Sequence, residues 1–370
     1  MLRRMREATS LTRAGRLHDA TALIQRTLRG AETDASQRQP ADGPDPAAPE
    51  RAVGAAPVRV PSAVVETRRT TDRADSSAHR GANRAAATRG RFISGSSTTG
   101  AGTRPYKVYV PAAPTGTAVP LLVLLHGCTQ DADDFAAGTR MNALADRHGF
   151  VVVYPEQTRQ ANPSRCWNWF EAADQRRDRG EPSIIADIVR TVIGSTPIDR
   201  RRIHVVGMSA GGAMAAVMGH TYPDLFSAVG VHSGLAHGAA TDLSSALRAM
   251  RHGGGTPRVA GRGIPAIVFH GDRDQTVHRS NAEQVLRQAT AHVPHPLLTV
   301  HEGAGGGAHD ATRYVYRSPD GSTLAEGWAV HGLGHAWSGG DPAGSHTDPH
   351  GPDASVEMLR FFSQHARHRA

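Results

Sequence analysis

The feature that most constrains this chain is a five-residue turn, Gly-Met-Ser-Ala-Gly, at residues 207–211. It follows the apolar run 203–206 and precedes residues 212–218, whose alanines and methionines favour a helix. A strand that passes through G-x-S-x-G into a helix makes a sharp turn, and the turn projects the serine from the end of the strand. Small residues must flank the serine because larger side chains would collide there. We therefore expect Ser209 to sit on a nucleophile elbow.

The composition divides the chain into three parts. Residues 1–30 have apolar residues at spacings that predict a helical segment. Residues 31–103 consist mostly of Ala, Arg, Pro, Ser, Thr, Gly and Asp, with Phe92 as their only aromatic residue. Because such a segment cannot bury enough apolar surface to offset the entropy of ordering, we expect a disordered linker. Residues 104–370 alternate between strand and helix signals and form the expected catalytic domain.

The basic character of the chain belongs to its first part. The formal net charge is +8, and residues 1–100 contain 17 Arg against 10 acidic residues, which accounts for +7 of it. Almost no aromatic residues lie between these charges, so we expect no nucleic-acid partner. No uninterrupted apolar core follows the early arginines, and no run approaches the ~20 apolar residues of a membrane span. We therefore expect a cytoplasmic protein without a signal peptide or membrane span.

From residue 104 onward, short apolar runs alternate with amphipathic stretches. Run 121–125 is continuously apolar, as in a parallel strand that is buried on both faces. Strands that alternate with helices predict an α/β fold, with a mainly parallel sheet covered by helices on both faces. The expected strands are 106–110, 121–125, 150–154, 203–206, 227–232, 264–270, 297–302, 311–317 and 324–330, and the expected helices are 134–148, 183–193, 212–218, 281–292 and 356–365. In such sheets ligands bind beyond the carboxyl ends of the strands, so the residues that follow each strand are the candidate site.

The loop His-Gly-Cys-Thr-Gln at residues 126–130 directly follows the strand 121–125. A loop in this position can turn a backbone N–H toward the elbow, where it and the N–H of Ala210 would form an oxyanion hole. Backbone donors suit this task because they are fixed in place before the negative charge develops. We expect His126 to shape the loop and to transfer no proton.

A catalytic acid and base are expected after the serine in chain order. Asp272 and Asp274 both follow the strand 264–270, and we favour Asp274 because the spacing Gly-x-x-Asp lets its carboxylate turn back toward a histidine. Asp272 is then a turn residue. Among the 21 histidines, His335 stands in a glycine-rich loop after the last strand. The order Ser209, Asp274, His335 is that of the α/β-hydrolases.

Four other histidines are lesser candidates for the base: His309, His331, His346 and His350. Their spacings fit no familiar ligand pattern, so we expect no metal ion. No motif indicates a cofactor of another kind.

Five segments together resemble the polyhydroxybutyrate (PHB) depolymerase family of serine esterases, which includes relatives that act on feruloyl and acetyl esters. They are residues 126–130, 166–170, 207–212, 271–274 and 334–340. The resemblance implies an α/β-hydrolase fold with Ser209 as nucleophile, His335 as base and Asp274 as the acid that orients the base. It also implies that Cys128 and Ala210 donate their backbone N–H groups to the oxyanion.

The same resemblance implies that Trp167, Asn168, Trp169 and Trp337 line the substrate cleft. Three of the four tryptophans lie in these two loops, as expected if aromatic surface grips an apolar polyester. The alternative for each of these tryptophans is packing in the core.

The two cysteines, Cys128 and Cys166, both lie in segments that carry the resemblance. A disulfide between them would hold the expected oxyanion loop against the tryptophan-bearing loop. A reducing cytoplasm argues against such a bond.

The expected function is hydrolysis of ester bonds in poly- or oligo-(3-hydroxybutyrate) through an acyl-enzyme. Compared with secreted members of the family, we expect no signal peptide and no added polymer-binding module, which favours oligomers, amorphous polymer or small esters over crystalline polymer. A feruloyl- or acetyl-type carboxylesterase is the nearer alternative. The alternative from another class is a non-catalytic protein that binds polymer granules through the helical segment 1–30. An extracellular location, as in family relatives, is the alternative to the cytoplasm.

Overall fold

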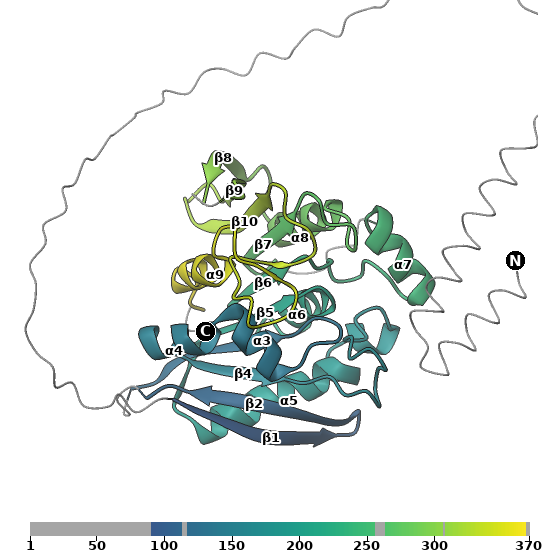
Figure 1. Cartoon of the computed structure of the whole chain (residues 1–370), viewed down its shortest axis with the longest axis vertical. Helices are drawn as coiled ribbons and strands as arrows, with labels where there is room; N and C mark the ends of the chain where they lie inside the picture. Colours follow the sequence, from purple (N-terminus) through teal and green to yellow (C-terminus); the bar gives the residue numbers. More distant parts are fainter. Residues whose placement is uncertain (1–89, 113–116, 256–262, 306–307, 368–370) are drawn as a thin grey trace, which may run out of the picture. The chain divides into compact units, whose positions relative to one another are not determined.

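The computed structural model describes residues 90–112, 117–255, 263–305 and 308–367 (Figure 1). The chain divides into two units, Met1–Arg84 and Ala85–Ala370, and the fold below is that of the second. The predicted helical segment 1–30 and residues 31–89 of the predicted linker lie outside the described residues, so both stay predictions.

A ten-stranded sheet runs through the second unit, and its middle is parallel. In spatial order the strands are β1 (Arg91–Thr99), β2 (Gly102–Val110), β4 (Val151–Pro155), β3 (Val119–Leu125), β5 (Ile198–Met208), β6 (Ala228–His232), β7 (Ala266–Gly271), β10 (Thr323–Val330), β9 (Ala311–Arg317) and β8 (Leu297–Ala304). All neighbours from β4 to β10 pair in parallel, whereas β1, β2, β9 and β8 pair antiparallel at the two edges. The predicted mainly parallel α/β fold is therefore confirmed.

Helices cover both faces of the sheet (Figure 1). One face packs against α3 (Ala132–Thr139), α4 (Met141–His148) and α9 (Ala354–Ser363), and the other against α5 (Gly180–Ser195), α6 (Ala210–Thr221), α7 (Leu243–His252) and α8 (Ser280–Thr290). A short 3₁₀ helix, η1 (Ala172–Gln175), precedes α5. Two hydrophobic cores result, one on each side of the sheet.

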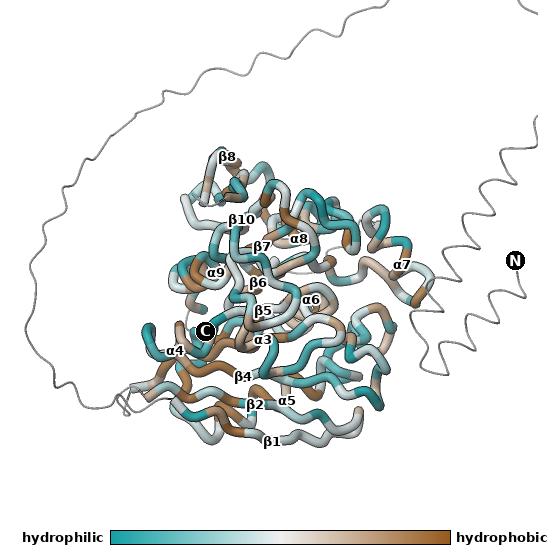
Figure 2. Tube along the Cα trace, in the orientation of Figure 1, coloured by the Kyte–Doolittle hydropathy of each residue, from teal (hydrophilic) through white to brown (hydrophobic). Residues whose placement is uncertain are grey.

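Strand β3 shows why the central strands have continuous apolar sequences. Successive side chains of a strand point to opposite faces, so Leu121, Val123 and Leu125 enter one core while Leu122 and Leu124 enter the other. The hydrophobic colour in Figure 2 accordingly runs along central strands such as β4, and the connecting loops are mostly hydrophilic. A strand buried on both sides needs an apolar residue at every position.

The predicted linker 31–103 extends too far, because ordered structure begins before residue 103. Residues 91–110, most of which were assigned to disordered chain, form the antiparallel hairpin of β1 and β2. Strand β1 lies at the edge of the sheet and is mostly exposed, with only Ser97 buried. Such a strand is held by backbone pairing and needs few apolar side chains, so its composition resembles that of an unstructured segment.

The predicted helix 134–148 is in fact two helices, α3 and α4. They meet at Arg140, whose φ of 55° is left-handed and ends the first helix. The Arg140 guanidinium donates hydrogen bonds to the Gly339 carbonyl at 2.8 Å and to Asp353 at 2.5 Å. This break therefore ties the helical layer to the loop that carries His335.

Four histidines, His126, His204, His232 and His270, are buried within the fold, and burial favours the neutral form of each. Burial lowers the pKa of His126 from 6.5 to about 4, and it lowers the pKa of His204 and of His232 to about 3. In the unfolded chain these rings titrate near 6.5. Between about pH 3–4 and 6.5 the unfolded state therefore binds more protons than the folded state, so the free energy of unfolding rises with pH in this window.

We predict that the protein loses stability as the pH falls below 6.5, by up to about 1.4 kcal/mol per pH unit for each of His126, His204 and His232. Thermal melts from pH 8 to pH 4.5 measure the effect. His204→Phe keeps an aromatic ring beside Phe362, whose centroid lies 4.6 Å from that of His204, and removes one titrating group. Its melting temperature should fall less steeply with acid, and a profile parallel to that of the wild type contradicts the prediction.

Candidate active site

Ser209 occupies the turn between β5 and α6 in a strained backbone conformation. Its φ is 55° and its ψ is −120°, a region that residues with a side chain rarely adopt. A Cβ atom at Gly207 would lie 2.1 Å from the Gly211 carbonyl oxygen, and one at Gly211 would lie 2.0 Å from the Leu125 carbonyl oxygen. Both glycines of the motif are therefore required by backbone contacts. The Ser209 N–H donates to the His232 carbonyl at 2.8 Å, which fixes the turn against β6.

Asp274 and His335, the predicted acid and base, are 61 residues apart in the sequence and are in contact in the structure. The His335 Nδ1 lies 2.7 Å from Asp274 Oδ2, and the other carboxylate oxygen accepts the N–H groups of Thr276 and Val277, each at 2.9 Å. Since a carboxylate accepts hydrogen bonds, Nδ1 carries the proton and Nε2 is left free to accept one.

Asp272 has a different set of partners. Its carboxylate lies 3.0 Å from His331 Nδ1 and accepts the Gly332 N–H at 2.8 Å. It therefore shapes the turn after β10, in the role expected of it, and it pairs with one of the lesser histidine candidates.

The Asp274 side chain is fully buried but keeps its charge. Burial acts to raise the pKa of Asp274, but the hydrogen bond and the positive charge of His335, with the Val277 N–H, outweigh burial and hold the pKa below its ordinary value. An ionised Asp274 stabilises a positive charge on His335, which is what a proton acceptor in this position requires.

In the part of the chain that the structure describes, neither Ser209 Oγ nor His335 Nε2 has a hydrogen-bond partner. Ser209 is 8% exposed and the His335 side chain 16% exposed, so both can be reached from solvent. Catalytic hydrogen bonds are often long in unliganded enzymes and shorten when substrate binds.

The loop 126–130 is held in place by side chains that bond its backbone. His126 Nε2 accepts the Gln157 N–H at 3.0 Å, so its Nδ1 donates to the Gly127 carbonyl at 2.8 Å. Gln130 Oε1 accepts the Gly127 N–H at 3.0 Å, and its amide nitrogen donates to Asp134 at 2.8 Å. With both ring nitrogens committed to the backbone, His126 shapes the loop as expected.

The loop also touches the elbow and presents an unused donor. A Cβ atom at Gly127 would lie 3.6 Å from the Cβ of Ser209. Among the described residues, neither the Cys128 N–H nor the Ala210 N–H has an acceptor. Ala210 is the first residue of α6, where backbone N–H groups lack partners within the helix.

A disulfide joins Cys128 to Cys166, a pairing that the sequence left open, and the chain has no other cysteine. The Thr129 N–H donates to the Ser164 carbonyl at 2.7 Å beside it. The bond thus fastens the loop 126–130 to the loop that follows β4.

Comparisons with known proteins show the family of the chain. A family model described as esterase PHB depolymerase matches residues 104–293, slightly more than half of the chain. The chain belongs to this family. Poly(3-hydroxyalkanoate) depolymerase C of Paucimonas lemoignei is 34% identical over 241 residues, which cover 61% of this chain and 57% of that protein. Feruloyl esterase B of Neurospora crassa is 30% identical over 273 residues, which cover 69% of this chain and 86% of that protein.

The fold is also that of solved esterases. An acetyl xylan esterase from Aspergillus awamori superposes with a TM-score of 0.57 at 20% identity, and the match covers 74% of this chain and 99% of that one. The α/β-hydrolase fold implied by the resemblance is therefore confirmed.

The structure corrects the expectation that the three tryptophans line the substrate cleft. Trp167, Trp169 and Trp337 are 0%, 5% and 1% exposed, so all three pack inside the protein. Trp337 stacks on His232 with the ring centroids 4.9 Å apart, and its Nε1 donates to Ser355 Oγ at 3.1 Å. The alternative of packing in the core therefore holds for all three.

Asn168 is half-buried, and its polar atoms are used within the protein. Its side-chain nitrogen donates to Glu181 at 2.9 Å, and its side-chain oxygen accepts from Asn162 at 2.9 Å. A contact between Asn168 and substrate stays a prediction.

The sequence analysis missed two residues that organise this site. His232, fully buried, binds the elbow through its carbonyl, and its Nε2 accepts the Ser338 N–H at 2.9 Å. It therefore connects the Ser209 turn to the His335 loop. Its position at the end of a strand next to that of Ser209 was the available signal.

The second missed residue, Glu181, is 3% exposed at the start of α5. Its carboxylate accepts from the Asn168 N–H at 2.8 Å, from Arg104 at 3.2 Å and from Gln157. Nothing in the local sequence distinguishes it from a surface glutamate at a helix start.

Two further observations concern the described residues only. They contain no cluster of three or more His, Cys, Asp or Glu side chains that could hold a metal ion. Nor does any of their helices have the length and apolar character needed to cross a bilayer.

We predict that Cys166→Ala lowers the free energy of unfolding by up to about 4 kcal/mol, the chain-entropy value for cysteines 38 residues apart. Denaturant titration of the variant and of the wild type without reductant measures the loss. The denatured wild type should release no free thiol, and finding two thiols per chain contradicts the bond.

Proposed function

We propose that this family member is a serine esterase in which Ser209 is the nucleophile, His335 the base and Asp274 the acid that orients the base. The observation that carries the proposal is the 2.7 Å contact between Asp274 and His335 Nδ1 in a chain whose serine occupies a strained elbow. The contact leaves Nε2 as the proton acceptor, which the reaction requires.

In the first step His335 Nε2 takes the proton of Ser209 as Oγ attacks the ester carbonyl carbon. The carbonyl oxygen becomes an oxyanion, and the unpartnered N–H groups of Cys128 and Ala210 donate to it. The tetrahedral intermediate collapses, the C–O bond breaks, and His335 returns the proton to the departing alcohol. The acyl group remains on Ser209.

In the second step His335 takes a proton from water, and the resulting hydroxide equivalent attacks the acyl carbon. The same two N–H groups meet the second oxyanion. When the acyl–Ser209 bond breaks, Oγ recovers its proton from His335 and the carboxylic acid leaves. The disulfide between Cys128 and Cys166 supports this role of the loop, because a fixed donor loses no energy to reorganisation.

The substrate we propose is an ester of 3-hydroxybutyrate, as polymer or oligomer. The match to a poly(3-hydroxyalkanoate) depolymerase at 34% identity supports it, although the alignment covers 57% of that relative. A feruloyl- or acetyl-type ester is the second candidate, because feruloyl esterase B of Neurospora crassa aligns over 86% of its length. Granule binding through residues 1–30 lies outside the described residues.

We also propose that the protein works in an oxidising compartment, the extracellular alternative to the cytoplasmic location first expected. The disulfide beside the site supports this location because thiols stay reduced in most cytoplasms. Recovery of the native protein with two free thiols would speak for the cytoplasm.

We predict that Ser209→Ala abolishes hydrolysis of p-nitrophenyl butyrate and that Asp274→Asn lowers kcat by about 10²–10⁴-fold, because His335 loses the carboxylate that orients it. The matched control is Asp272→Asn, two residues away, for which a change of less than about 10-fold is expected. If Asp272→Asn costs more than Asp274→Asn, the assignment of the acid is wrong.

A substrate panel separates the candidate activities. We predict serine-dependent release of 3-hydroxybutyrate from amorphous polymer and from oligomers, measured beside p-nitrophenyl butyrate, a feruloyl ester and acetylated xylan. Faster turnover of the feruloyl or acetyl ester would move the substrate to the second candidate. Binding of the polymer without any turnover that depends on Ser209 would support the non-catalytic alternative.

A further inference from the structure

A buried histidine, His270, lies beside Asp274 and takes no part in the proposed mechanism. It is 3% exposed and stands near the carboxyl end of β7, four residues before Asp274. Its Nε2 lies 2.7 Å from the Val277 carbonyl oxygen. Because a carbonyl oxygen only accepts hydrogen bonds, Nε2 carries the proton of the ring and donates it to this bond.

The other ring nitrogen of His270 has no partner within the described residues. Burial lowers the pKa of His270, so the ring is neutral near pH 7 and Nδ1 is an acceptor. This Nδ1 is buried and accepts no hydrogen bond from any residue that the structure describes. A buried acceptor without a donor costs stability, so an apolar ring would suit the position better if packing alone mattered. The donor on Nε2 is the property that an apolar ring would lack.

Val277 connects this donor to Asp274. The Val277 N–H donates to Asp274 Oδ1 at 2.9 Å, and the Val277 carbonyl accepts from His270. His270 Nε2 also lies 3.5 Å from Asp274 Oδ2, the oxygen that contacts His335. His270 therefore holds the residue that binds one carboxylate oxygen, and it places the positive end of an N–H dipole near the other.

The segment 272–278 has few other attachments. Near its ends, the Arg273 N–H donates to the Leu333 carbonyl at 3.1 Å and the His278 N–H to the Met250 carbonyl at 2.7 Å. Between these two points, in the described part of the chain, the backbone of the segment receives one side-chain hydrogen bond from outside it, and His270 donates that bond.

We propose that His270 is a positioning residue, which through Val277 fixes the Asp274 carboxylate in the orientation that aligns His335. The inference rests on the proposed function, because it assigns a role within the same site. His270 acts through Asp274 and does not touch the reacting atoms. A displacement of about 1 Å in such a group costs on the order of 10²-fold in rate.

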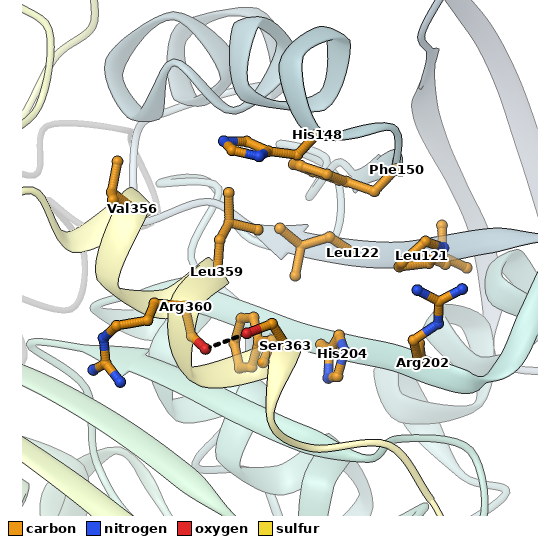
Figure 3. Close-up of a pocket in the computed structure, with 12 residues that line it drawn as sticks. Leu121, Leu122, His148, Phe150, Arg202, His204, Val356, Leu359, Arg360 and Ser363 are labelled. Carbon is orange, nitrogen blue, oxygen red and sulfur yellow. Dashed lines mark hydrogen bonds between the residues drawn. The ribbon is translucent and has the colours of Figure 1, made fainter. Parts of the chain in front are cut away.

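A second buried histidine, His204, provides a matched control. It is 4% exposed and lines a cavity of about 460 Å³ between α4, α9 and the sheet (Figure 3). The Ser227 hydroxyl donates to the Ile203 carbonyl at 3.0 Å, so it accepts a hydrogen bond from His204 Nδ1, also at 3.0 Å. The ring of His204 stacks on that of Phe362. None of these partners belongs to the proposed triad.

The test measures hydrolysis of p-nitrophenyl butyrate by His270→Phe, His270→Gln and His204→Phe. His270→Phe keeps a ring but removes the donor, so we expect kcat to fall at least about 10-fold while KM changes less than about 2-fold. His270→Gln keeps a donor for the Val277 carbonyl and should recover most of the lost kcat. His204→Phe also replaces a buried histidine, and its kcat should stay within about 2-fold of the wild type.

Three kinetic results contradict the proposal. They are a wild-type kcat in His270→Phe, an equal loss of kcat in His204→Phe, and a His270→Gln variant no more active than His270→Phe. Thermal melts of the two phenylalanine variants show whether a loss of kcat is accompanied by unfolding.

A second measurement does not depend on turnover. The proton that His335 Nδ1 donates to Asp274 lies in a short charge-assisted hydrogen bond, and low-field ¹H NMR detects such protons. We expect its resonance in the wild type, Ser209→Ala and His204→Phe, and its loss or displacement in His270→Phe. An unchanged resonance in His270→Phe overturns the positioning role, whether or not the protein hydrolyses the ester. Absence of turnover that depends on Ser209 in the wild type would instead overturn the proposed function.

Discussion

The contact between two stretches of backbone at the elbow is the constraint on which the rest of the site depends. Gly211 lies so close to the carbonyls of Leu125 and His126 that a Cβ atom there would be 2.0 Å and 2.5 Å from their oxygens. This approach brings the end of β3 against the start of α6. The loop that follows β3 consequently begins beside Ser209.

Buried polar side chains hold the surrounding loops against this contact. His232 joins the Ser209 turn to the His335 loop, and Gln130 joins the loop 126–130 to Asp134 and Ser345. Glu181 performs the same task for the loop that carries Cys166, through Gln157 and Asn168. Because the buried histidines are neutral near pH 7, they hydrogen-bond the backbone of these loops without the cost of a buried charge. Rigidity of this kind is what a preorganised oxyanion hole requires.

The sequence predicted the parallel centre of the sheet and its β9–β8 edge well, but it missed β1 at the other edge. A strand buried on both faces, such as β3, must be apolar at every position, and this leaves a strong local signal. An exposed edge strand such as β1 is held by backbone bonds to β2, and its side chains carry little information. The tryptophans were misassigned for a different reason. Composition cannot distinguish an aromatic ring that faces a cleft from one that packs inside the protein.

By itself the sequence determined the class of fold, the elbow and the chain order of Ser209, Asp274 and His335. These depend on local periodicity and on turns that only glycine permits. The sequence also favoured Asp274 over Asp272, and the structure pairs Asp274 with His335. Tertiary structure alone decided which side chains hold the loops. The bond from Ser338 to His232 spans 106 residues, and the bonds from Gln130 to Ser345 span 215. Contacts between residues so far apart in sequence depend on how the strands are ordered in the sheet, and no local pattern records that order.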